Sequence, residues 1–125
     1  ESIKEYIMKK LIVAASMATM AMALSTGAQA ANAISTEELM SYCKSTDSSS
    51  FVTCEIYGQA VYDTYLVTRN SKTAPEFICL KQPAPTRKEV IQEFIGWAEK
   101  NTQYAADPAA DSVLRFLAGK FPCGK

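Results

Sequence analysis

Histidine is absent from this chain of 125 residues. Its absence excludes the Ser-His-Asp and Cys-His arrangements of nucleophilic enzymes, histidine-ligated metal sites and the attachment of c-type haem. The sequence also lacks a C-x-x-C pair and a glycine-rich phosphate-binding loop, so neither a zinc ribbon nor a nucleotide site is expected. Glu89 and Glu93 lie four residues apart on a helix face that we expect to be solvated, not catalytic. We therefore expect a binding protein without cofactor or metal, and not an enzyme.

An excess of basic residues is lacking as well. The chain has 13 Lys and Arg and 13 Asp and Glu. Residues 1–30 hold three of the basic and two of the acidic residues, so residues 31–125 carry 10 (13 − 3) basic and 11 (13 − 2) acidic side chains, a net charge of −1. Such a domain is not expected to bind nucleic acid or the surface of an anionic membrane.

The first thirty residues are typical of a secretory signal peptide. A basic start at Met8 to Lys10 precedes an apolar run from Leu11 to Leu24, and Ala28-Gln29-Ala30 follows as a cleavage signal. The apolar run is shorter than the roughly 20 residues that span a membrane. We therefore expect three parts: upstream residues 1–7 before the natural start, a signal peptide over residues 8–30, and a periplasmic domain over residues 31–125 without a membrane anchor.

All four cysteines lie in the expected mature part. An even number of cysteines in a small exported domain predicts two disulfides. Cys43 and Cys54 flank one serine-rich loop, whereas Cys79 and Cys123 bracket the C-terminal half. Among the three pairings that four cysteines allow, we predict Cys43–Cys54 and Cys79–Cys123.

Apolar periodicity predicts an all-α domain of four helices, because no segment of residues 31–125 alternates as a strand does. Ser35 with Glu38, and Thr86 with Glu89, form capping boxes that begin the first and third helices. The first helix is expected to run from the cap at Ser35 to about residue 44, and the second from about 50 to 69. The third is expected to begin at 86 and to include the apolar stripe 90–98. The fourth is expected to have Asp107 as N-cap and Pro108 as first helical residue, and to end at about 120.

Two further features qualify this pattern. Gly58, in the middle of the second helix, is expected either to allow the close approach of another helix or to be neutral. The long segment 70–85 contains three prolines and cannot continue a helix. Its apolar residues 77–80 are expected to attach it to the core.

The order of these motifs resembles the Rap/Tai family of type VI secretion immunity proteins. The resemblance is carried by Cys43, the Cys54-x-x-Tyr57-Gly58 step, Phe77-x-Cys79 and the terminal Phe121-Pro122-Cys123. It implies a periplasmic helical protein, often a homodimer. Its partner would be a peptidoglycan amidase of the NlpC/P60 cysteine-peptidase type, injected by sibling cells. The immunity protein would bind this effector and block its active-site cleft.

We expect the effector to contact the exposed part of the third helix and the turn after it, since a convex element fits an enzyme cleft. Tyr104 would supply an aromatic anchor. The first-choice residues are Trp97, Asn101, Thr102, Gln103 and Tyr104, and the second-choice residues are Arg69, Asn70 and Lys72.

A homodimer is expected because a domain of this size buries a limited core. Trp97, Tyr62 and Phe116 lie at the flanks of their apolar stripes, where a second copy would cover them. Two other functions remain open: a small periplasmic acid-stress chaperone, for which the lack of histidine removes the usual trigger, and a carrier of lipids or small ligands.

Overall fold

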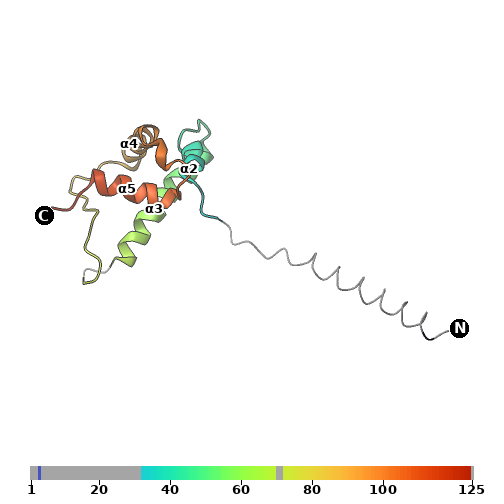
Figure 1. Ribbon diagram of the computed structural model, residues 1–125. Coiled ribbons are helices and arrows are strands. Elements are labelled where there is room, and N and C mark those ends of the chain that lie inside the picture. The colour runs from blue at the N-terminus through green and yellow to red at the C-terminus, as the bar shows by residue number, and fades with distance from the viewer. Residues whose placement is uncertain (1–2, 4–31, 70–71, 125) are drawn as a thin grey trace. The chain divides into compact units, whose positions relative to one another are not determined.

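The computed structural model describes residue 3 and residues 32–69 and 72–124 (Figure 1). The expected upstream residues and signal peptide thus lie outside the described residues, apart from residue 3. The elements follow in the order α2 (Thr36–Cys43), α3 (Ser48–Thr68), α4 (Arg87–Lys100), the 3₁₀ helix η1 (Thr102–Tyr104) and α5 (Ala109–Lys120). The prediction of an all-α domain with four helices is confirmed within these ranges. None of the described helices is both long and apolar enough to cross a membrane.

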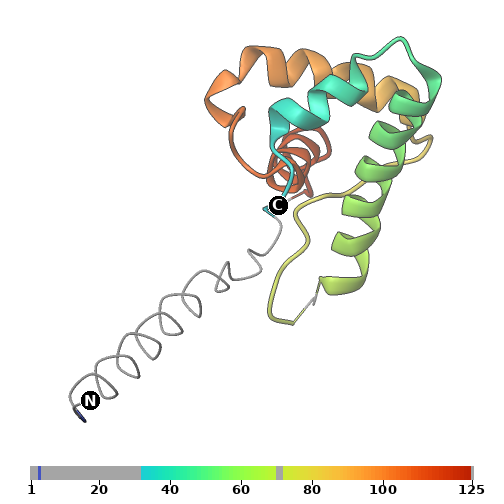
Figure 2. The same cartoon turned by 90° about the vertical axis from the view of Figure 1, so that its right-hand side faces the viewer.

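Helix α5 lies at the centre of the folded domain. Figure 2 shows it nearly end-on, with α2 and α4 above it and α3 to one side. Its inward side chains Val113, Phe116 and Leu117 are all buried. Phe116, which we expected at a flank open to a second copy, is therefore a core residue, because α5 is covered from several sides.

Side-chain caps begin three of the helices. The Ser35 hydroxyl accepts a hydrogen bond from the Glu38 N–H (3.1 Å), which is one half of the expected capping box, whereas Thr86 and Glu89 form both halves of theirs. Helix α3 begins at Ser48, about two residues earlier than expected, because the Asp47 carboxylate accepts from the Ser50 N–H (2.9 Å). A carboxylate at a helix N-terminus satisfies free backbone donors and extends the helix by these residues.

The start of α5 differs from the prediction. Pro108, not Asp107, is the N-cap residue, and the helix begins at Ala109 without a side-chain cap. The Asp107 carbonyl instead accepts hydrogen bonds from the backbone N–H (2.9 Å) and the hydroxyl (3.1 Å) of Thr36. The Ala109 N–H donates to the Ile34 carbonyl (2.8 Å). The Ile34 carbonyl therefore satisfies one of the free N–H donors at the start of α5.

The two predicted disulfides are both present, Cys43–Cys54 between α2 and α3 and Cys79–Cys123 between the long segment and the C-terminal residues. The long segment is attached to the core as expected. Ile78 is only 1% exposed, and the Tyr65 hydroxyl accepts from the N–H groups of Phe77 (3.1 Å) and Ile78 (3.2 Å). These contacts hold residues 77–79 in one place beside α3.

We predict that Thr36→Val lowers the free energy of unfolding by about 2 kcal/mol. Thr36 is buried, and its hydroxyl hydrogen-bonds with the Ser112 hydroxyl at 2.7 Å. Valine keeps the shape but leaves the Ser112 hydroxyl, which is 0% exposed, without this partner. Urea unfolding measures the loss. The double variant Thr36→Val/Ser112→Ala is the control. It should lose less than the sum of the single variants, and strict additivity would contradict a coupled pair.

Candidate functional site

The residues that we expected first to contact the effector lie at the end of α4 and in the segment after it. Asn101 ends α4, and its Nδ2 donates to the Trp97 carbonyl (2.8 Å). The expected turn contains the short helix η1, in which Thr102 and Gln103 are exposed and Tyr104 is half-buried. The Gln103 amide donates to the Asn101 side-chain oxygen (3.3 Å). Thr102 and Gln103 thus present polar groups to solvent on an ordered turn.

Tyr104 is held by neighbours within the chain. Its ring stacks on Trp97, with centroids 5.8 Å apart and planes 8° from parallel. The Arg115 guanidinium lies 4.3 Å from the ring centroid, a cation–π distance. Arg115 is positioned by Asp111 (3.0 Å), whose side-chain hydrogen bond raises the pKa of Arg115. The predicted aromatic anchor is therefore a fixed part of the domain and presents only part of its ring.

Trp97 belongs mainly to the core beneath this surface. It is half-buried and packs against Phe94 (6.1 Å between centroids) and Phe116 (6.0 Å). The first-choice residues are therefore brought together by the structure as one continuous feature. Trp97 supports this feature from below, and Thr102 and Gln103 form its outer part.

The second-choice residues lie elsewhere. Arg69 follows the end of α3, where its guanidinium pairs with the Glu76 carboxylate (2.9 Å) and lies over the Tyr65 ring. Lys72 is exposed, and Asn70 lies outside the described residues. Both views place the C-terminal end of α3 away from the connection between α4 and α5 (Figures 1 and 2). The two predicted sets of residues therefore form two surfaces, not one.

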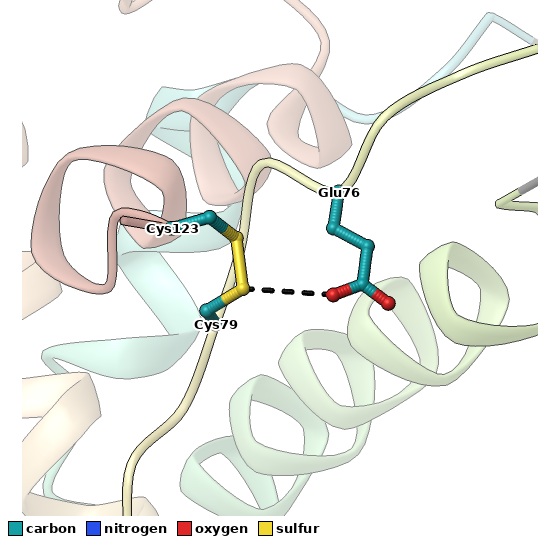
Figure 3. A group of neighbouring side chains, drawn as sticks. All are labelled: Glu76, Cys79 and Cys123. Atoms are coloured by element: carbon teal, nitrogen blue, oxygen red, sulfur yellow. Dashed lines mark hydrogen bonds between the residues drawn. A yellow bond between two sulfur atoms is a disulfide. The ribbon is translucent and has the colours of Figure 1, made fainter. Parts of the chain in front are cut away.

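Glu76, Cys79 and Cys123 offer three atoms of the kinds that bind metal ions within 4.8 Å of one another (Figure 3). Metal binding by cysteine requires thiolates, and both sulfur atoms are engaged in the disulfide. One Glu76 oxygen lies 3.6 Å from the Cys79 sulfur, and the other pairs with Arg69. The arrangement is a covalent crosslink with an adjacent ion pair, and it cannot hold a metal in this state.

Two carboxylates among residues 32–69 and 72–124 have lowered pKa values. The pKa of Asp47 is lowered by hydrogen bonds from the Ser49 side chain and the Ser50 backbone. The pKa of Glu89 is lowered by hydrogen bonds from the Thr86 side chain and backbone. Both carboxylates cap helices at the surface, so their shifts reflect local structure.

A groove between α3 and α4 is the feature that the sequence analysis missed. It has a volume of about 320 Å³, and core residues such as Phe94, Phe116 and Leu117 line it. Gly58 also lines it, and a Cβ atom placed there would meet nothing within 4 Å. Of the two alternatives for Gly58, the close approach of another helix is therefore wrong, because the space beside Gly58 is open.

A second hollow lies on another side of α3. It has a volume of about 470 Å³ and is bounded by Thr64, Thr68, Pro75, Phe77 and Leu114. Phe77 at its edge is 45% exposed. Helix α3 therefore has hollows on two sides, although its exposed apolar residues Val52, Ile56 and Val67 line neither of them.

Comparison with protein families gives one informative result. The model of a family described as Rap1a immunity proteins matches residues 35–123. The match begins at the residue that caps α2 and ends at the last disulfide cysteine. Comparisons with curated proteins and with solved structures yield no match.

Proposed function

Because the chain belongs to the Rap1a immunity protein family, we propose that it protects its own cell by binding a toxic effector delivered by the type VI secretion system of sibling cells. The observation that carries this proposal is the extent of the family match. It covers residues 35–123 and therefore includes all four described α-helices and both disulfides. The match is to a whole domain and not to one short motif.

The proposed target is a peptidoglycan amidase of the NlpC/P60 cysteine-peptidase type, and the proposed compartment is the periplasm. The motif order that resembles the Rap/Tai family supports the target. Two disulfides in so small a domain support an oxidising compartment. The pattern of residues 8–30 supports export.

The proposed mechanism is occlusion without chemistry. A protein that only binds must be present well above its dissociation constant, and nanomolar affinity corresponds to about −12 kcal/mol. An interface of about 1,600 Å² in total is usual for such complexes. The outer residues of η1 are proposed to enter the effector cleft, and a homodimer is proposed as the state of the free chain.

A titration of effector activity tests this function. Tagged residues 31–125 serve as bait for the secreted proteins of a sibling culture, and the retained protein is identified and assayed on peptidoglycan. We expect a cysteine amidase whose activity falls to zero at one binding site per effector and returns after the complex is denatured and separated. Retention of no hydrolase, inhibition far below stoichiometry, or an effector that emerges cleaved would contradict the proposal. In cells, deletion of residues 8–30 should abolish protection.

For the η1 surface, Gln103→Ala combined with Tyr104→Ala is expected to weaken the complex by about 2 kcal/mol, roughly 30-fold in dissociation constant. The reason is loss of a preorganised ring and an exposed amide from one ordered turn. Calorimetry with the amidase measures the change.

The single variant Gln103→Ala leaves the Trp97–Tyr104 stack intact, and Gln92→Ala is an exposed control on α4. Thermal unfolding of each variant separates lost contacts from lost folding. Equal affinity of the double variant and the parent chain would exclude η1 as the contact surface.

A further inference from the structure

The groove between α3 and α4 reaches from the surface to the core of the domain. One wall is a single face of α3, on which Gly58 lies near the middle, and the other wall is the buried stripe of α4. Phe94 is 5% exposed, and Phe116 and Leu117 of α5 are 6% and 7% exposed at the base. Residues that form the core of the domain are thus also the lining of an open groove.

The size of the groove fits side chains and not a whole helix. A cavity of about 150 Å³ accepts one benzene-sized group, so a volume of about 320 Å³ has room for about two. The open space beside Gly58 adds width where any other residue would place a side chain. The groove therefore has the dimensions of a receptor for two apolar side chains from another molecule.

The rim of the groove carries one charge of each sign. Glu55 on α3 and Arg87 at the start of α4 both line it. Within residues 32–69 and 72–124, neither has an ion pair or a side-chain hydrogen bond, although Lys44–Glu99 and Lys120–Glu93 are paired nearby on the same domain. Two unpaired opposite charges in the lining of an apolar site are complementary to an apolar segment that carries one basic and one acidic residue.

We propose that this groove is a second contact site for the effector, which inserts an apolar segment of about two large side chains flanked by a basic residue facing Glu55 and an acidic residue facing Arg87. The inference rests on the proposed function, and it adds a site in which the effector enters the immunity protein. A fatty acid could pair its carboxylate with Arg87, but it carries no cation to pair with Glu55. A protein segment uses both charges.

Filling the groove tests the inference. Gly58→Leu places a side chain in open space within the groove, so the domain should fold while the effector loses its site. With the effector retained by the parent chain as the probe, we expect the dissociation constant to rise at least 30-fold. Gly58→Ala, which gains helix propensity without filling the groove, should stay within threefold. Gly96→Leu adds the same side chain to α4 outside the groove lining and should also stay within threefold.

Charge reversal tests the rim. Glu55→Lys and Arg87→Glu should each weaken binding three- to tenfold, with a smaller effect at high salt. A photo-crosslinking residue at Gln59, which lines the groove, should attach to a single effector segment, whereas one at the exposed Thr53 should not. The basic residue of the effector segment that faces Glu55 can then be replaced by an acidic one. This replacement should restore the affinity of the effector for Glu55→Lys.

The possible failures are distinguishable. If the parent chain retains no effector, the proposed function fails and the inference fails with it. If the parent and Gly58→Leu bind the effector equally, only the groove assignment is overturned. If the free parent chain is a dimer in solution and Gly58→Leu is a monomer of half that mass, the groove is occupied by a second copy of the chain. If laurate binds the parent chain but not Gly58→Leu while effector affinity is unchanged, the occupant is an amphiphile. Either of the last two results overturns the proposal.

Discussion

Replacing Cys79 and Cys123 together with alanine is expected to lower the free energy of unfolding by about 4 kcal/mol, the loop-closure value for a crosslink of this span. The disulfide closes a loop with a sequence separation of 44, which contains the whole of α4, η1 and α5. In the unfolded chain this crosslink removes many conformations. In the folded chain it holds the long segment to the C-terminal residues, where the Cys79 N–H also donates to the Phe121 carbonyl (2.8 Å).

The second disulfide supplies the comparison. Cys43 and Cys54 are separated by 11 residues, so their replacement by alanine should cost about 3 kcal/mol from loop closure. Both cysteines are 3% exposed, so packing loss adds to this value. Urea unfolding of the two double variants measures both costs. A loss below about 1 kcal/mol for the Cys79/Cys123 variant would show that contacts around Ile78 alone hold the segment, contrary to the loop-closure argument.

Phe94→Ala is expected to cost about 4 kcal/mol of stability, within the usual range for a buried phenylalanine. The ring meets Phe116 edge to face (5.6 Å between centroids) and stacks near Trp97, which in turn supports Tyr104. Removing it enlarges a groove that already reaches the core, so the neighbouring helices cannot easily close the gap.

Phe94→Leu is the matched control, and it should cost about 1 to 1.5 kcal/mol because most of the apolar volume is retained. The loss is measured by urea unfolding, and near-ultraviolet circular dichroism reports the packing of Trp97. Similar stability of Phe94→Ala and Phe94→Leu would mean that Phe94 is a wall of the groove and not a part of the core.

The sequence predicted local features well because their causes are local. The caps at Ser35 and Thr86 depend on a residue three positions further along the chain, and apolar spacing of 3.6 residues marked the stripes of α4 and α5. The disulfide pairing followed from which segments each cysteine pair flanked. The N-cap of α5 was missed because Asp107 is engaged by Thr36, 71 residues away, and no local pattern reveals that contact.

The candidate site was less predictable for the same reason. Residues 101–104 were recognised as a turn, but Arg115 contacts Tyr104 only because α5 folds back beside η1. The groove depends on how far α3 and α4 diverge, which is a property of packing and not of periodicity. One signal was present in the sequence. Apolar residues lie around most of the circumference of α3, and Gly58 interrupts them at a position with open space beside it.

The hydrogen bonds between residues 34–37 and 105–109 determine the order in which the domain can be completed. During synthesis, which proceeds from the N-terminus, Thr36 is made long before its hydrogen-bond partner Asp107, which lies 71 residues further along the chain. The hairpin of α2 and α3 can close early, because Cys43 and Cys54 are only 11 residues apart. The complete domain can form only when α5 has emerged, since non-local contacts cannot precede their later partner. Until α5 has been synthesised, the apolar faces of α2, α3 and α4 lack the helix against which they pack, so the domain gains its full stability only at the end of synthesis.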